Sequence, residues 1–178
     1  MDEDQLNSTE KETRKQAECT KWRVEQSFRF TASKFHLVSK RQRNHENFAD
    51  TLLNPKPVAS KYLEHGKKYE PVALVEYEEF MSSRRTPVKV LPCGFVVSQG
   101  IPIIGATPDA QVIDFGCVDH FGLAEVKCPY TKHHVTPLDA CSDPKFFMEK
   151  TADTECKLIA QVQGQMAATG ARWCDFII

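Results

Sequence analysis

Three ionisable side chains with the chemistry of a hydrolytic site fall within one short stretch of the chain: Asp109, Glu125 and Lys127. Glu125 and Lys127 are two residues apart in an otherwise apolar segment, and residues with this spacing share one face of a β-strand. Burying charged groups costs roughly several kcal/mol each unless a counter-ion neutralises them. A divalent cation bound by the two carboxylates would neutralise them, so the pattern indicates a metal-dependent hydrolytic site.

A β-hairpin is the element that would bring these three residues together. Two apolar runs, residues 110–115 and 123–128, flank a polar, glycine-containing stretch over 116–122. This pattern predicts two antiparallel strands joined by a loop longer than the tightest hairpin turns. A turn centred near Val118 would place Asp109 close to Lys127. We therefore expect an aspartate, a glutamate and a lysine to converge from neighbouring strands.

The other elements are predicted from periodicity and turn residues. Apolar residues recurring at three- and four-residue steps predict a helix from Ser60 to about Phe80. We expect strands over 88–91 and 95–97, joined by a turn, then strands over 101–106 and 173–178. A last helix should start near Ser142 or Asp153 and end at Ala168. Residues 1–16 have almost no large apolar side chains, which predicts a frayed segment or a solvated helix.

The amino-acid sequence of the predicted hairpin resembles motifs of a known family. Pro108-Asp109 followed by Glu125-Val126-Lys127 resembles the motif of the PD-(D/E)XK nuclease superfamily. The longer segments around it, 105–110 and 122–129, resemble the YqaJ-like viral recombinase family, which are relatives of the phage lambda exonuclease. The resemblance implies an α/β fold with a restriction-endonuclease-like core, in which a mixed central sheet is flanked by helices. It covers residues 20–178 and leaves 1–19 as a charged extension. Because relatives continue with further strand and helix, it also implies a C-terminally truncated domain.

Two further blocks of the family add catalytic candidates. The segment 65–70, His-Gly-Lys-Lys-Tyr-Glu, resembles the family's Gly-Lys-x-Tyr-Glu block, which implies that Glu70 lies at the metal site. The Ala-Gln-Val-Gln block at 160–163 implies that Gln161 reaches the attacking water and the scissile phosphate. The resemblance thus implies a catalytic set of five residues: Glu70, Asp109, Glu125, Lys127 and Gln161.

A third block implies contacts with a DNA phosphate. Trp22, Arg29 and the segment 31–33, Thr-Ala-Ser, occupy the positions of the family's N-terminal signature, whereas Gln26 replaces its first arginine. In exonuclease relatives this region holds the 5′-terminal phosphate, which implies that role for Arg29 and Ser33. A surface salt bridge is the alternative for Arg29. Thr107 stands where some relatives have a serine that contacts phosphate.

The resemblance also implies the cofactor, the substrate and the partners. Mg²⁺, with Mn²⁺ as a substitute, would be held by Glu70, Asp109, Glu125 and the backbone carbonyl of Val126, while Lys127 would orient the attacking water. The implied function is a Mg²⁺-dependent DNA nuclease, an exonuclease acting on double-stranded DNA ends in recombination or repair. A ring-shaped homo-oligomer and a recombinase partner are implied by the same analogy. The alternative is a non-catalytic DNA-binding or recombination scaffold that keeps the nuclease fold.

Charge and composition add limits to these interpretations. The net charge of −1 gives no global signature of a nucleic-acid-binding protein. The segment from Lys11 to Arg43, however, contains ten basic and only three acidic residues, an excess of seven. That segment is either a solvated helix face or an arm that attracts phosphates. The chain has no apolar run of membrane-spanning length, which predicts no membrane association. Seven cysteines without a secretory signal predict an intracellular, reducing compartment.

A competing zinc site must be weighed against the magnesium site. Cys117, His120, Cys128 and the pair at 133–134, His-His, have a spacing reminiscent of zinc ligands. Gathering them around one ion would distort the strand pairing that sets Asp109 beside Lys127. We therefore interpret the cysteines as small packing residues.

Overall fold

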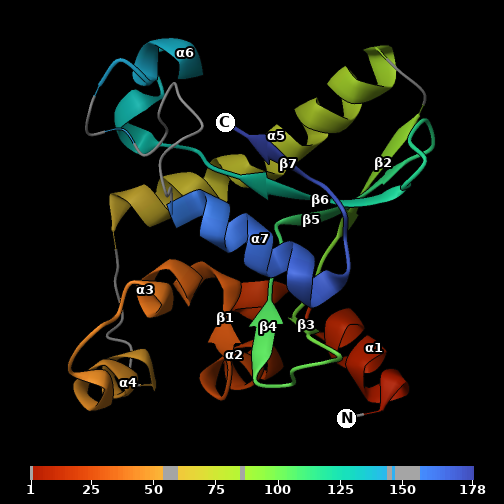
Figure 1. Cartoon of the computed structure of the whole chain (residues 1–178). Helices are drawn as coiled ribbons and strands as arrows, with labels where there is room; N and C mark the ends of the chain where they lie inside the picture. Colours follow the sequence, from red (N-terminus) through yellow and green to blue (C-terminus); the bar gives the residue numbers. More distant parts are fainter. Residues whose placement is uncertain (1, 54–59, 85–86, 144–145, 147–156) are drawn as a thin grey trace. The chain divides into compact units, whose positions relative to one another are not determined.

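The computed structural model describes residues 2–53, 60–84, 87–143, 146 and 157–178. The chain forms two compact units, each assembled from segments that are distant in sequence (Figure 1). Unit 1 comprises Met1–Ala59, Pro92–Pro108 and Ala160–Gly170, and unit 2 comprises Ser60–Leu91, Asp109–Ile159 and Ala171–Ile178.

Unit 1 combines a small mixed sheet with helices. Its strands are β1 (Phe30–Thr31), β3 (Val96–Val97) and β4 (Ile104–Ala106), in the order β1-β4-β3, with β1 parallel and β3 antiparallel to β4. Its helices are α1 (Glu3–Glu12), α2 (Thr20–Ser27), α3 (Phe35–Ser39), α4 (His45–Leu53) and most of α7 (Lys157–Thr169), with the short 3-10 turns η1 (Gln16–Glu18) and η2 (Ala32–Lys34). Of the two predicted starts of the last helix, Ser142 is wrong, because this residue lies in a turn, and Asp153 lies outside the described residues.

The N-terminal segment is an anchored helix. Asp2 caps α1 with a reciprocal pair of hydrogen bonds to Gln5, the capping-box arrangement that stabilises a helix start. At the other end, the buried Thr13 hydroxyl accepts the Phe95 N–H at 2.7 Å, and Glu10 accepts the Gly94 N–H at 2.9 Å. Of the two predicted alternatives, a frayed segment or a helix, the structure confirms the helix. Its C-terminal end is hydrogen-bonded to the backbone that precedes β3.

A left-handed residue follows this helix and holds a more distant segment. Gln16 has a φ of 45°, which costs a residue with a side chain roughly 1 kcal/mol or more. Its side-chain amide donates to the carbonyls of Cys93, at 3.1 Å, and of Pro108, at 3.3 Å. These two hydrogen bonds offset the strain, because they satisfy carbonyls in a partly buried part of unit 1.

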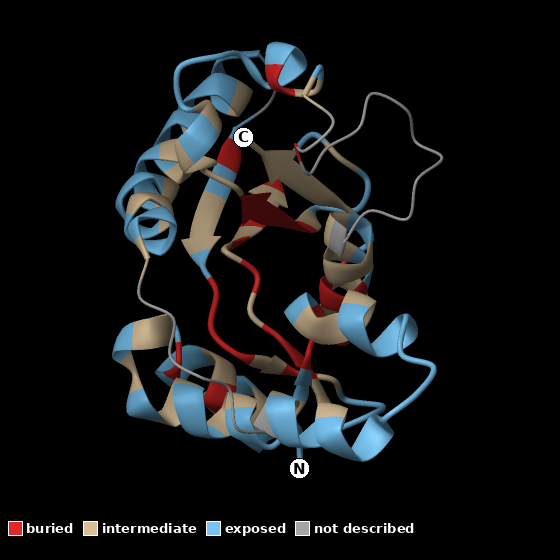
Figure 2. Cartoon of the chain, turned by 90° about the vertical axis from the view of Figure 1, so that its left-hand side faces the viewer, coloured by how far each residue is buried: buried red, intermediate tan, exposed pale blue. Residues whose placement is uncertain are grey.

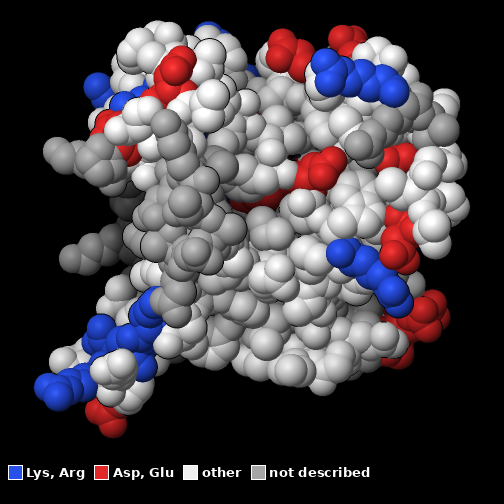
Figure 3. Space-filling model, turned by 45° about the horizontal axis from the view of Figure 1, so that its top comes forward, with Lys and Arg blue, Asp and Glu red and all other residues white. Residues whose placement is uncertain are grey.

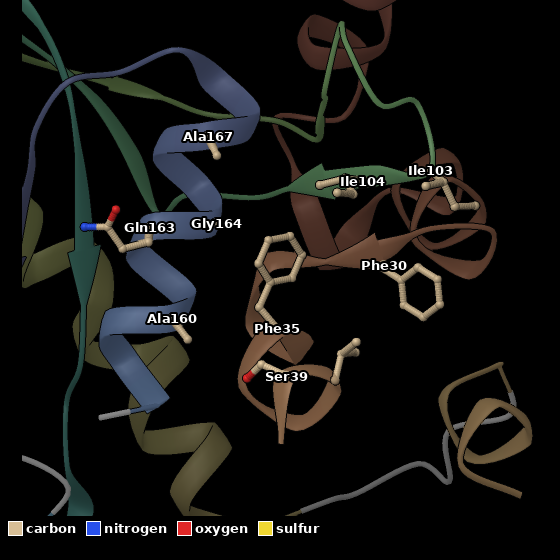
Figure 4. Close-up of a pocket in the computed structure, with 10 residues that line it drawn as sticks. Phe30, Phe35, Ser39, Ile103, Ile104, Ala160, Gln163, Gly164 and Ala167 are labelled. Carbon is tan, nitrogen blue, oxygen red and sulfur yellow. The ribbon is translucent and has the colours of Figure 1, made fainter. Parts of the chain in front are cut away.

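An apolar pocket of about 670 Å³ lies on unit 1 (Figure 4). Phe35 is directed at α7, where the lack of a side chain at Gly164 makes room for its ring; a Cβ there would lie 2.6 Å from the ring. Gln163 points away from the aromatic rings in the same view. The pocket wall is therefore formed almost entirely by hydrocarbon, including Phe30, Ile103 and Ile104.

Unit 2 is a four-stranded mixed sheet with one long helix on it. The strands are β2 (Val88–Pro92), β5 (Ala110–Asp114), β6 (Phe121–Val126) and β7 (Cys174–Ile177), in the order β2-β5-β6-β7. β6 is antiparallel to β5 and parallel to β7. The long helix is α5 (Lys61–Arg84), and the segment after β6 forms the 3-10 turn η3 (Tyr130–Lys132) and the short α6 (Pro137–Ala140).

The core of unit 2 lies between α5 and the sheet. Leu74, Tyr77 and Met81 of the helix pack against the buried side chains of β2, β5 and β6. Tyr77 also donates its hydroxyl hydrogen to Asp175 of β7 at 2.5 Å. Five of the six residues of β6 are buried, because neighbours on both edges and the helix cover this strand; the buried residues are drawn red in Figure 2.

The predicted fold class is confirmed, whereas one detail of the predicted connectivity is wrong. The strands expected at 88–91 and 95–97 do form, as β2 and β3, but they belong to different sheets instead of pairing through the intervening turn. Hydrogen bonds of the connecting Gly94 and of Phe95 to α1 explain why no local pairing forms. Among the residues that the structure describes, no helix is both long enough and apolar enough to cross a membrane.

Candidate active site

The predicted hairpin is present, with a pairing that differs from expectation. Ala110 pairs with Ala124 and Ile113 with Phe121, so the loop is centred on Cys117 instead of Val118. The next residue outward from each strand pair places Asp109 opposite Glu125, with Lys127 two positions further along. The strand begins earlier than its apolar pattern suggested because Gly122 lies under the indole of Trp173, where a Cβ would come within 2.2 Å of the ring.

Backbone and side-chain hydrogen bonds fix the three residues of the motif. Asp109 Oδ2 accepts the Val126 N–H at 2.7 Å. The Lys127 amine donates to Glu125 Oε1 and, at 3.1 Å, to the Val126 carbonyl oxygen. Glu125 is 1% exposed, whereas the Lys127 side chain is 32% exposed and so reaches solvent. The hairpin thus holds a buried carboxylate beside an accessible amine.

Glu70 of α5 belongs to the same electrostatic cluster. Burial raises the pKa of Glu70, the amine of Lys127 lowers it, and the charge of Glu125 raises it further. Burial, followed by repulsion from Glu125, raises the pKa of Asp109 to about 7, although Lys127 and the Val126 N–H act in the opposite direction. The positive charge of one amine therefore acts on three neighbouring carboxyl groups, so the cluster contains more acidic than basic groups.

This excess of carboxylate oxygen fits the chemistry of a hard divalent cation. Within the described residues, however, no three histidine, cysteine, aspartate or glutamate side chains are already arranged to hold a metal ion. The hydrogen bonds explain this, because Lys127 engages Glu125 and the Val126 N–H engages Asp109. Binding a cation here would require the amine to move away from Glu125.

The candidate zinc residues of the hairpin loop have other partners. Cys117 Sγ donates to Asp114 Oδ2 at 3.1 Å, and His120 Nδ1 lies 2.9 Å from the Asp114 carbonyl oxygen. The other Asp114 carboxylate oxygen accepts the Gly116 N–H. These contacts order the loop around Asp114, in line with the structural interpretation of Cys117.

The predicted phosphate-binding residues all lie in unit 1. Arg29 is 11% exposed, and its guanidinium bonds Glu25 Oε2 at 2.5 Å and the Pro102 carbonyl at 2.9 Å. Ser33 is exposed, and its hydroxyl shares a hydrogen bond with Thr31 at 3.1 Å. Thr107 Oγ1 accepts the indole N–H of Trp22 at 3.0 Å. Arg29 thus forms the ion pair that was one of its two predicted roles, although this pair is poorly exposed instead of lying on the surface.

Gln161, the remaining predicted catalytic residue, lies on the part of α7 that belongs to unit 1. Its side chain is partly buried there. The other four catalytic candidates belong to unit 2, and the structure groups them as predicted around the hairpin.

The basic segment at 11–43 divides into two parts. Near its start, Arg14 and Lys21 form ion pairs with glutamates of α1. Near its end, Lys40, Arg41 and Arg43 are exposed between α3 and α4. Figure 3 shows basic side chains gathered where this second part lies, at the lower left. Ion pairs thus account for two basic residues of the first part, whereas the second part groups three exposed basic residues, as expected of a phosphate-attracting arm.

The structure also gathers aromatic residues that the sequence analysis did not group. A pocket of about 430 Å³ in unit 2 is lined by Lys127 together with His65 and Tyr69 of α5 and His133, which follows η3. The available signal was the spacing of Tyr62, His65 and Tyr69, which places them along one face of a helix. The partners after β6 could not be read from sequence, because that segment has no periodic pattern.

A mixed α/β core that carries Pro-Asp immediately before one strand and Glu-x-Lys at the end of the adjacent strand defines the restriction-endonuclease-like class of nucleases. Residues 11–172 match the YqaJ-like viral recombinase domain, and the chain belongs to that family. This is a family of exonucleases and recombination nucleases.

Solved structures agree with this assignment. The chain is 28% identical to an alkaline exonuclease, LHK-Exo from Laribacter hongkongensis, with a TM-score of 0.62 over 87% of this chain and 71% of that one. A crystal structure of LHK-Exo in complex with dAMP is 26% identical, with a TM-score of 0.62 over 87% of this chain and 70% of that one. No curated protein sequence matches the chain.

Proposed function

We propose that this protein is a Mg²⁺-dependent deoxyribonuclease, an exonuclease that acts on double-stranded DNA ends in recombination or repair. The observation that carries the proposal is the cluster of Glu70, Asp109 and Glu125 around the single amine of Lys127. Clusters of ionisable groups with perturbed pKa values are typical of catalytic sites. Membership of the family and likeness to an alkaline exonuclease support the reaction class.

The residues of the cluster suit Mg²⁺ by the type of their donor atoms. Mg²⁺ takes hard oxygen ligands, and Mn²⁺ accepts the same set. The carboxylates of Glu70, Asp109 and Glu125 and the Val126 carbonyl would hold the ion. Two of these groups now accept hydrogen bonds from Lys127, so ion and amine would compete for them. When bound, Mg²⁺ supplies Lewis acidity and lowers the pKa of a coordinated water.

The chain's own groups would do the remaining work. Once released from Glu125, the Lys127 amine would orient the attacking water and offset the negative charge that develops on the phosphate. Gln161 would donate its amide hydrogens to the water or the scissile phosphate. Ser33 and Arg29 would bind a terminal phosphate. Because Thr107 Oγ1 accepts the Trp22 N–H, its own hydroxyl hydrogen stays available for a phosphate oxygen.

The test is a gel assay of purified protein with linear and circular duplex DNA, each with Mg²⁺ and with EDTA. We expect progressive loss of the linear duplex in Mg²⁺, an intact circle, and no degradation in EDTA. Cleavage of the circular duplex would show that the protein is an endonuclease instead of an exonuclease. Binding of DNA without cleavage under any metal condition would favour the alternative, a non-catalytic DNA-binding or recombination scaffold.

Assembly is a separate proposal that rests on the family. We infer a ring-shaped homo-oligomer that encloses the duplex and a recombinase that receives the resulting single strand. Sedimentation of the protein alone tests the first, and co-sedimentation with a single-strand-annealing recombinase tests the second. A monomer at micromolar concentration, with and without DNA, would contradict the ring.

A further inference from the structure

The pocket beside the candidate active site combines apolar residues with basic and aromatic ones and with the carboxylate of Glu76. It measures about 430 Å³, within the range of small-ligand sites, and Phe146 at its wall is 8% exposed. His65 and Tyr69 line it from α5, and Lys127 and His133 line it from the segment that follows β6. Because Lys127 also bonds the buried Glu125, the pocket opens directly beside the candidate catalytic carboxylates.

Aromatic rings from two segments meet at this pocket. The His65 ring lies 4.6 Å from the ring centre of Tyr69, 5.4 Å from that of Tyr130 and 5.8 Å from that of His133. Tyr62 extends the group, with its ring 5.5 Å from Tyr130. Planar rings at these separations provide surfaces on which further planar groups can stack.

Two properties separate this group from an ordinary packing cluster. First, the rings are not buried: Tyr62 is 53% exposed, Tyr69 is 40% exposed, and His133 is exposed as well. Second, amines accompany them. Lys61 Nζ lies 4.9 Å from the Tyr130 ring centre, and Lys68 Nζ lies 5.0 Å from that of Tyr69. Exposed rings interleaved with amines are the recognised means of holding unpaired nucleic acid.

We propose that this pocket receives an unpaired nucleobase of the DNA substrate, stacked on His65 and Tyr69, while the neighbouring lysines contact the flanking phosphates. The strand would then reach the carboxylates as a single strand with one base turned into the pocket. This inference rests on the proposed nuclease function for its substrate, but binding is measured independently of cleavage.

The test compares binding of short single-stranded oligonucleotides that carry one abasic residue, moved along the strand, in EDTA. For the wild-type protein, we expect one or two positions at which loss of the base weakens binding roughly 5- to 100-fold. For Tyr69→Ala and His65→Ala, the same abasic residue should weaken binding less than about twofold. An abasic penalty of equal size in the wild type and in both variants would overturn the proposal.

A second measurement reports stacking directly. 2-Aminopurine at the sensitive position should lose fluorescence on binding to the wild type and to Tyr69→Phe, which keeps the ring, but not to Tyr69→Ala. Phe80→Ala is the matched control, because Phe80 is a 50% exposed aromatic residue on the same helix outside the pocket. Variants that lower thermal stability while 2-aminopurine remains quenched would show that the rings only attach η3 to α5.

The outcomes separate this proposal from the proposed function. An abasic penalty that depends on Tyr69, in a protein that cleaves no DNA, would support the pocket and contradict the nuclease. Cleavage of linear duplex with an unchanged abasic penalty in Tyr69→Ala would support the nuclease and contradict the pocket.

Discussion

The two units of this protein use buried charge in opposite ways. In unit 1 the poorly exposed Arg29 and Glu25 form one ion pair, with side-chain exposures of 11% and 15%. In unit 2, three carboxyl groups share the amine of Lys127, and the pKa of Asp109 is raised to about 7. In a balanced pair each charge compensates the other, whereas an uncompensated excess of one sign costs free energy in the isolated protein. The unbalanced cluster is therefore the one with the features of a catalytic site.

The pockets of the two units repeat this contrast. The pocket of unit 1 is larger, about 670 Å³, and lined mostly by hydrocarbon, whereas that of unit 2, about 430 Å³, combines apolar residues with two lysines, two histidines, a tyrosine and a glutamate. Size alone would favour the first as a functional site. Chemistry favours the second, because it contains amines that can bind phosphate and imidazoles that can transfer protons.

The largest effect should come from the unbalanced cluster. Asp109→Asn keeps an oxygen that can accept the Val126 N–H, but it loses a charged oxygen for Mg²⁺. We expect the rate of linear-duplex degradation to fall roughly 1,000-fold or more, with stability unchanged or increased. Asp119→Asn, at a half-exposed position in the loop of the same hairpin, is the control. Retention of more than about a tenth of the activity in Asp109→Asn would remove Asp109 from the catalytic set.

Lys127→Ala should lower turnover roughly 100-fold or more while sparing metal binding, because the amine stabilises charge without being a ligand. Mg²⁺ affinity, measured by titration calorimetry, should stay equal or rise, since Glu125 and the Val126 carbonyl lose a competitor. Lys89→Ala, which removes an exposed lysine of the same unit, should change neither quantity. Loss of Mg²⁺ binding in Lys127→Ala would mean that its assignment is wrong.

In unit 1, removal of the Arg29 side chain should lower stability more than activity. Arg29→Ala leaves Glu25 poorly exposed and unpaired, so we expect the free energy of unfolding in urea to fall by about 1–3 kcal/mol. The double variant Arg29→Met, Glu25→Gln should recover most of it. If Arg29 also binds a terminal phosphate, the double variant will be stable yet will lose the preference for 5′-phosphorylated over 5′-hydroxyl ends. An Arg29→Ala protein as stable as the wild type would contradict the structural role.

The pH dependence of stability should reveal the carboxyl excess. The folded protein keeps the Asp109 proton up to about pH 7, whereas an unfolded chain releases it near pH 4. The free energy of unfolding should therefore fall as the pH rises through this interval and then level off. In EDTA we expect the melting temperature to drop by on the order of 10 °C from this group, less in Asp109→Asn, and Mg²⁺ should restore it. A melting temperature that rises with pH over this interval in the wild type but not in Asp109→Asn would contradict the shift.

The smallest effects compare one helix glycine in each unit. A Cβ at Gly66 of α5 would meet no atom within 4 Å, so Gly66→Ala should raise the free energy of unfolding by about 0.5–1 kcal/mol. A Cβ at Gly164 of α7 would meet the Phe35 ring at 2.6 Å, so Gly164→Ala should lower it by about 1–3 kcal/mol. Chemical denaturation measures both. If Gly66→Ala slows cleavage despite greater stability, DNA approaches the helix at that point.

Local patterns in the sequence predicted the hairpin, α5 and the grouping of Asp109, Glu125 and Lys127, because alternation and helical spacing are properties of neighbouring residues. The exact strand pairing was missed because it depends on Trp173, which covers Gly122 from a distant part of the chain. The Pro102 partner of Arg29 was missed for the same reason, since Pro102 is remote in sequence, whereas Glu25 is only four residues from Arg29. The N-terminal helix was readable, as Asp2 and Gln5 have capping-box spacing.

The left-handed Gln16 gives the first residues of the chain a part in the motif that follows β4. Its side-chain amide donates a hydrogen bond to the carbonyl of Pro108, the residue immediately before Asp109. The preceding helix α1 positions Gln16 for this contact. The predicted charged extension, residues 1–19, suggests a truncated protein that begins at residue 20. This truncation should remove the hydrogen bond to Pro108 and so loosen the proline of the Pro-Asp dipeptide. A minimal version of this domain should keep its amino-terminal helix.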